Sequence, residues 1–160
     1  MKKKYRCLIK NEYTHKNYSL ETIQENEIEK IRIWRNKNIK ILLVEDSDVQ
    51  KELAISRFES LDFNNVTGVS NGLEAISYLE AGPVDVDLII SDWDMPEMNG
   101  IDLLRVVRET TDFQKTPFFL MTIHDDDNKI SIAKKEGVTE FLCKPVTNET
   151  LLETIKKVFS

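Results

Sequence analysis

Residues 39–46 read Ile-Lys-Ile-Leu-Leu-Val-Glu-Asp, and residues 86–92 read Val-Asp-Leu-Ile-Ile-Ser-Asp. Each stretch is a short, mostly apolar run that leads into an acidic residue. Similar apolar runs occupy residues 66–69, 118–122 and 139–143. Because the runs are largely continuous and do not alternate with polar residues, they predict strands buried on both faces of a parallel sheet.

Helical patterns fill the intervals between these runs. They cover residues 48–61, 71–81, 100–110, 125–136 and 147–159. In the first of them, Val49, Leu53, Ile55, Phe58 and Leu61 lie roughly on one side of a helix. Five strands that alternate with five helices predict an α/β fold. The expected architecture is a doubly wound parallel sheet with right-handed crossovers and helices on both faces.

Charge is unevenly distributed along the chain. Residues 1–40 carry a net charge of +6 and residues 41–160 a net charge of −12. An acidic body repels nucleic-acid phosphates, so we expect no nucleic-acid partner. No apolar run is long enough to span a bilayer. The two cysteines, Cys7 and Cys143, fit a reducing compartment. We therefore expect a soluble, cytoplasmic protein without membrane insertion.

Residues 1–38 stand outside the alternating pattern and form a basic N-terminal extension. We expect this extension to be either helical or disordered. The apolar residues that fall near one face of a helix are Leu20, Ile23, Ile28, Ile31 and Trp34. The remaining residues, 39–160, are expected to form one domain.

Chemically reactive side chains follow four of the five predicted strands. Glu45 and Asp46 follow the first strand, Asp92 the third, Thr122 the fourth and Lys144 the fifth. In an open parallel sheet, ligands bind beyond these carboxyl ends. Clustered carboxylates repel one another unless a cation intervenes, and their oxygens suit Mg²⁺. An aspartate can also act as a nucleophile toward phosphorus, with metal and lysine neutralising the charge that is transferred.

Each of these residues has an ordinary explanation when taken alone, such as a helix cap or a surface charge. Their joint occurrence at strand ends instead predicts a phosphoryl-transfer site. At this point the sequence resembles a known family: residues 39–159 resemble a response-regulator receiver domain. The motifs that carry the resemblance are Ile-Leu-Leu-Val-Glu-Asp-Ser (41–47), Phe-Asn-Asn-Val (63–66), Ile-Ser-Asp-Trp-Asp-Met-Pro-Glu-Met-Asn-Gly (90–100), Leu-Met-Thr (120–122) and Lys-Pro-Val-Thr (144–147).

The resemblance implies a flavodoxin-like sheet with strand order 2-1-3-4-5. It also implies that Asp92 accepts a phosphoryl group from a histidine kinase, with Mg²⁺ as cofactor. Asp46 and Asp92 would bind the metal directly, together with the backbone carbonyl of Asp94. Glu45 would act through a metal-bound water.

Further roles follow from the same resemblance. Lys144 would pair with the phosphoryl group, and Thr122 would donate a hydrogen bond to it. Pro145 is expected to follow a cis peptide bond, and Gly100 to permit a tight turn. His124 and Asp94 occupy positions that tune the lifetime of the acyl phosphate.

The resemblance implies a single-domain response regulator that controls flagellar rotation in chemotaxis by phosphorylation-dependent binding to the motor switch. No enzymatic activity is expected beyond self-catalysed phosphorylation and autodephosphorylation. The expected partners are a chemotaxis histidine kinase, a flagellar motor switch protein and a phosphatase, and the chain is expected to be a monomer. The residues expected at the switch and partner face are Ile130, Phe141, Cys143 and Lys157. Phe141 lacks a hydroxyl group, so a switch at this ring would depend on its burial.

Two alternatives remain open on the sequence alone. A phosphorelay intermediate would pass its phosphoryl group to a histidine phosphotransfer protein. A Mg²⁺-dependent phosphatase of the haloacid-dehalogenase type would use Asp92 as nucleophile and Asp94 as acid and base. We rank the phosphatase low, because its nucleophile follows the first strand of the sheet and Asp92 follows the third.

Overall fold

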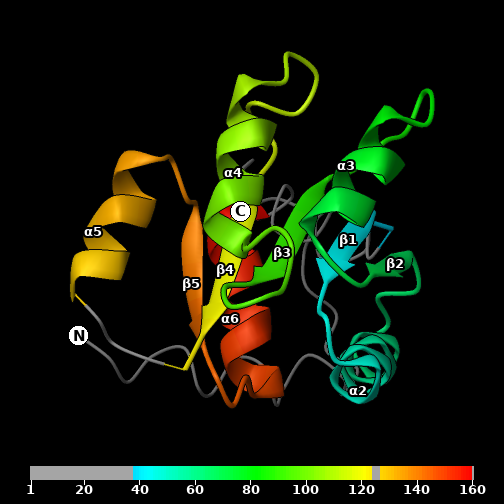
Figure 1. Cartoon of the computed structure of the whole chain (residues 1–160). Helices are drawn as coiled ribbons and strands as arrows, with labels where there is room; N and C mark the ends of the chain where they lie inside the picture. Colours follow the sequence, from blue (N-terminus) through cyan, green and yellow to red (C-terminus); the bar gives the residue numbers. More distant parts are fainter. Residues whose placement is uncertain (1–37, 124–126, 160) are drawn as a thin grey trace, which may run out of the picture.

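The computed structural model describes residues 38–123 and 127–159. Five strands and five helices alternate along this part of the chain (Figure 1). The strands are β1 (Ile41–Val44), β2 (Val66–Val69), β3 (Leu88–Asp92), β4 (Phe118–Thr122) and β5 (Glu140–Cys143). The helices are α2 (Asp48–Ser60), α3 (Gly72–Glu80), α4 (Gly100–Glu109), α5 (Asp127–Lys135) and α6 (Asn148–Phe159).

All strand pairs are parallel, and the sheet order is β2-β1-β3-β4-β5. The predicted flavodoxin-like architecture is therefore confirmed. Strands β2 and β5 form the two edges, and β3 lies at the centre. The predicted strand over 139–143 begins one residue later, at Glu140.

Two hydrophobic clusters fill the space on opposite faces of the sheet. One cluster contains Leu42 and Val44 and is covered by α3, α4 and α5 (Figure 1). The other contains Ile41 and Leu43 and is covered by α2 and α6. Successive strand residues point to opposite faces. Since both faces are covered, both sets must be apolar, and this explains the continuous runs in the sequence.

Side-chain caps fix where the helices begin. The Ser47 hydroxyl accepts a hydrogen bond from the Gln50 amide at 3.4 Å, at the start of α2. The Asn71 side chain accepts one from the Glu74 amide at 2.9 Å, at the start of α3. Such caps satisfy amides that have no partner within the helix. Asn71 lies three residues before Glu74, a spacing typical of a helix start.

The prediction for the apolar side of α2 is wrong. Phe58 is 2% exposed, but Val49 is 68% and Leu53 62% exposed. The helix packs on the sheet through Phe58, Ile55 and residues near them. Val49 and Leu53 lie on a second stripe, rotated away from the core, so the apolar residues of this helix form two stripes instead of one.

Two further expectations fall partly or wholly on residues outside the described ranges. The predicted extension lies there except for Asn38, and so does His124. The helix predicted over 125–136 is described from Asp127 onward. None of the described helices combines the length and the apolar composition that a membrane span requires.

Candidate functional site

The predicted reactive residues gather at the carboxyl edge of the sheet. Glu45 and Asp46 directly follow β1, and Asp92 ends β3, which is hydrogen-bonded to β1. Thr122 ends β4, the next strand, and Lys144 directly follows β5. The parallel register thus brings residues from distant parts of the chain to one edge.

Three carboxylates form a compact cluster at this edge. Glu45, Asp46 and Asp92 each offer one oxygen, and these oxygens lie within 4.8 Å of one another. Glu45 is 2% exposed, whereas Asp46 is exposed to solvent. The cluster repels itself electrostatically, and all its ligand atoms are hard oxygens. Because it is also open to water on one side, the donor set fits Mg²⁺, which retains several water ligands.

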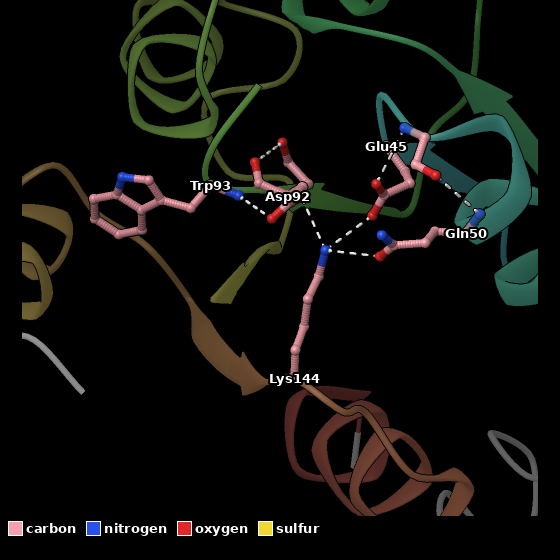
Figure 2. Close-up of polar contacts among 7 residues, drawn as sticks. Glu45, Gln50, Asp92, Trp93 and Lys144 are labelled. Atoms are coloured by element: carbon pink, nitrogen blue, oxygen red, sulfur yellow. Dashed lines mark hydrogen bonds and ion pairs between the residues drawn. The ribbon is translucent and has the colours of Figure 1, made fainter. Parts of the chain in front are cut away.

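Lys144 supplies a positive charge to this cluster (Figure 2). Its Nζ donates hydrogen bonds to Asp92 Oδ2 at 2.8 Å and to Glu45 Oε2 at 3.1 Å. Burial alone would lower the pKa of Lys144, but the hydrogen bonds and charges of Asp92 and Glu45 outweigh burial and raise this pKa. The side chain is therefore a protonated ammonium group that bridges β5 to both β1 and β3.

Gln50 is a site residue that the sequence did not predict. Its Oε1 accepts a further hydrogen bond from Lys144 Nζ at 3.4 Å (Figure 2). Gln50 lies in the first turn of α2, which begins two residues after Asp46. Its closeness in sequence to Glu45 and Asp46 could have indicated a role in the site. However, glutamine is common at the start of helices, so this position predicts a site residue only once the fold is known.

The carboxylate of Asp92 is oriented by its neighbours. Its Oδ1 accepts a hydrogen bond from the backbone N–H of Trp93 at 2.7 Å. Its Oδ2 contacts Lys144, and the side chain remains 13% exposed. A carboxylate that is fixed on two sides and open on a third can attack an incoming phosphorus atom without reorganising.

Thr122 and Pro145 lie at the carboxyl ends of β4 and β5. Thr122 is buried, with 5% of its surface exposed. Its backbone carbonyl accepts a hydrogen bond from the backbone N–H of Lys144 at 2.8 Å. This bond extends the pairing of β4 and β5 to the start of the loop that follows β5. The Lys144–Pro145 peptide bond is cis.

Asp94 does not join the carboxylate cluster through its side chain. That side chain is 64% exposed, and its Oδ1 lies 3.4 Å from the Nζ of Lys129 on α5. The same Nζ lies 5.4 Å from the ring centroid of Trp93, a distance at which a cation attracts an aromatic ring. Lys129 is a second residue that the sequence did not predict, and it links α5 to the loop that follows β3.

The residues expected at the partner face lie on β5 and on the helices α5 and α6. Phe141 and Cys143 are on edge strand β5, Ile130 is on α5, and Lys157 is on α6 (Figure 1). Phe141 is half-buried against the cluster beneath α3, α4 and α5, whereas Cys143 is exposed. Lys157 pairs with Glu140. The four residues therefore surround one edge of the sheet and include both of its sides.

Gly100 has a different role from the predicted one. It begins α4, and its amide donates to the Trp93 carbonyl at 2.9 Å. A Cβ atom at this position would lie 2.2 Å from the carbonyl oxygen of Asp92. Glycine is therefore required by the close approach of α4 to the backbone of the phosphoacceptor candidate, and not by the conformation of a turn.

Known proteins resemble both this sequence and this fold. The model of the response regulator receiver domain family matches residues 41–156. Chemotaxis protein CheY-3 of Vibrio cholerae is 36% identical over 124 residues, which are 78% of this chain and 94% of that protein. Chemotaxis protein CheY1 of Helicobacter pylori is 32% identical over 120 residues, which are 75% of this chain and 96% of that protein.

A solved structure agrees with these relatives. The chemotaxis response regulator CheY4 of Vibrio cholerae superposes with a TM-score of 0.67 at 31% identity, covering 75% of this chain and 98% of that one. The chain belongs to the response regulator receiver family.

The contact at Gly100 generates a prediction about stability. Gly100→Ala should lower the free energy of unfolding by about 1–3 kcal/mol, because the new methyl group overlaps the Asp92 backbone and one of them must move. Gly68→Ala is the control, since its Cβ would meet only flexible side-chain atoms at 3.0 Å or more. Urea unfolding monitored by circular dichroism measures both variants. An equal or smaller loss at Gly100 would contradict the explanation.

Proposed function

We propose that this chain is a single-domain response regulator that accepts a phosphoryl group from a histidine kinase on Asp92. The observation that carries the proposal is the cluster of three carboxylates within 4.8 Å, with the Lys144 ammonium 2.8 Å from Asp92. Its position at the carboxyl ends of parallel strands is where such a fold binds ligands.

The proposed transfer is a displacement at phosphorus. Asp92 Oδ2 attacks the phosphorus of a phosphohistidine whose other ring nitrogen carries a proton; an O–P bond forms, the N–P bond breaks, and the ring leaves as neutral imidazole with the electron pair of the broken bond. Lys144 then turns from the carboxylate to an oxygen of the bound phosphoryl group, and the Thr122 hydroxyl donates to another. Transfer of this kind depends mainly on positioning and charge stabilisation.

Mg²⁺ would be held by Asp46, Asp92 and the backbone carbonyl of Asp94, with Glu45 acting through water. When bound, it would neutralise the crowded carboxylates and the phosphoryl oxygens. Lys144 alone provides one positive charge against three carboxylates, so a divalent cation would bring the cluster close to neutrality. The buried position of Glu45 favours this arrangement, because a charge removed from water is costly unless an opposite charge lies near it.

The proposed output is binding to a flagellar motor switch protein in the cytoplasm, by a monomer that a phosphatase returns to its resting state. Support comes from the chemotaxis names of the relatives in Vibrio cholerae and Helicobacter pylori. The binding face would be formed by Ile130, Phe141, Cys143 and Lys157. Phosphorylation would act on this face through β5, which also leads into Lys144.

Asp92→Asn should abolish phosphorylation by acetyl phosphate and Mg²⁺, because the amide is not a nucleophile. The wild-type chain should gain one phosphoryl group per molecule by intact-protein mass spectrometry. Asp112→Asn, an exposed carboxylate outside the cluster, should label as the wild type does. Labelling that survives in Asp92→Asn would refute the assignment, and sustained multiple turnover of phosphomonoesters would favour the phosphatase.

Lys144→Met should tighten Mg²⁺ binding by roughly fivefold or more, because removing a nearby positive charge leaves the carboxylates less neutralised. The same variant should be phosphorylated more slowly, since the charge that pairs with the phosphoryl group is lost. Isothermal titration calorimetry measures the affinity, with Lys157→Met on α6 as the control. Weaker Mg²⁺ binding in Lys144→Met would show that the lysine shapes the metal site instead of competing with the metal.

Beryllofluoride, a mimic of the phosphoryl group, should increase the affinity for motor-switch peptides by about tenfold or more, within the usual range of coupling between two sites. Lys157→Ala should weaken the activated complex, because it removes a charge from the proposed face. Fluorescence anisotropy of labelled peptides provides the measurement. Affinity that is indifferent to activation, together with transfer to a histidine phosphotransfer protein, would favour the phosphorelay alternative.

A further inference from the structure

Gln50 closes a ring of hydrogen bonds beside the carboxylate cluster (Figure 2). Glu45 Oε1 accepts a hydrogen bond from the backbone N–H of Ser47 at 3.3 Å, and Ser47 Oγ accepts one from the backbone N–H of Gln50 at 3.4 Å. Lys144 Nζ donates to Gln50 Oε1 at 3.4 Å and to Glu45 Oε2 at 3.1 Å. The start of α2 and the end of β1 are thus joined to the same ammonium group.

The acceptors around Lys144 match the donors of its ammonium group in number. Such a group has three N–H donors and no acceptor, so the amide of Gln50 must turn its oxygen toward Nζ. The other two acceptors, Asp92 Oδ2 and Glu45 Oε2, are carboxylate oxygens. The Lys144 side chain, which is 18% exposed, is therefore held by three groups before phosphorylation.

The proposed phosphoryl transfer engages two of these acceptors and leaves the third. Asp92 Oδ2 would form the bond to phosphorus, and Glu45 would hold a water molecule of the Mg²⁺ ion. Both oxygens would then be weaker partners for Lys144. Gln50 is neutral and takes part in neither contact, and the Ser47 cap fixes its backbone at the start of α2. Its side-chain oxygen is therefore available to Lys144 both before and after the transfer.

We propose that Gln50 is a positioning residue that keeps Lys144 directed toward the phosphoryl group on Asp92. This role rests on the proposed function and adds a residue to it. While Gln50 holds Nζ, Lys144 has only to exchange its contact with Asp92 for one with a phosphoryl oxygen. Without Gln50, the ammonium group can turn to solvent, and the charge that stabilises the transfer is less well placed. The bond of 3.4 Å is long, so the effect on the rate is moderate.

The rate of phosphorylation by acetyl phosphate at saturating Mg²⁺ tests this role. Gln50→Leu should slow the reaction by roughly three- to tenfold, the size expected for one hydrogen bond. Because Gln50 is exposed, this change should leave the core intact. In a Lys144→Met background it should have no further effect, since Gln50 acts through the lysine. Gln114→Leu, the same change at an exposed position before β4, is the control and should react as the wild type does.

A measurement without phosphorylation tests the contact itself. In nuclear magnetic resonance spectra of the lysine ammonium groups, the order parameter of Lys144 Nζ should fall in Gln50→Leu. It should hold in Gln50→Glu, because a glutamate keeps an acceptor oxygen at this position. Lys51 Nζ, which donates to Asp48 and Ser70 at 2.8 Å, is the internal reference and should not change.

Three results would overturn the role of Gln50. The first is an unchanged order parameter of Lys144 in Gln50→Leu, and the second is a lower order parameter with an unchanged rate. The third is an equal slowing with and without Lys144, because Gln50 would then contact the phosphoryl group itself. A wild-type chain that is not labelled on Asp92 would instead refute the proposed function, even where the order parameter confirms the contact between Gln50 and Lys144.

Discussion

The whole site depends on one electrostatic constraint, the crowding of three carboxylates that a single lysine holds together. Glu45, Asp46 and Asp92 would repel one another at their observed separation. Lys144 opposes that repulsion with hydrogen bonds of 2.8 and 3.1 Å to Asp92 and Glu45. Its two partners come from β1 and β3, while it follows edge strand β5. This partial compensation of charge therefore requires the neighbouring strands β1, β3, β4 and β5 to be in register.

Much of this arrangement was predictable from the sequence, and the reason is the geometry of parallel sheets. Apolar runs such as 41–44 and 88–90 mark buried strands, and the residues after them must meet at one edge. The strand order came from resemblance, because no local pattern fixes which strands are neighbours. Gln50 and Lys129 were missed because their roles depend on where long side chains reach after folding, which residue type and spacing do not determine.

The prediction of a single apolar side for α2 was wrong for a physical reason that holds for amphipathic helices in general. Val49 and Leu53 extend the apolar spacing of the helix, but Phe58 and Ile55 define the direction of the core. The spacing of apolar residues in a sequence predicts a helix. It does not tell whether all of these residues lie on one buried face or whether some form a separate exposed stripe.

At Gly100 the residue type was informative, but the predicted reason for it was not the observed one. Glycine is needed there because α4 approaches the backbone of Asp92 closely, and only the folded chain shows this approach.

The net negative charge of the domain is unfavourable for binding an anionic group, and the position of Lys144 offsets this effect. Residues 41–160 carry a net charge of −12, yet the proposed substrate is an anionic phosphoryl group. At physiological ionic strength, exposed charges are screened beyond about 8 Å. The distant acidic surface therefore repels the donor weakly, while Lys144, and a divalent cation when one is bound, would act at contact distance. An acidic domain can therefore still bind a phosphoryl group, because the positive charges that attract this group are concentrated at the carboxyl ends of the strands.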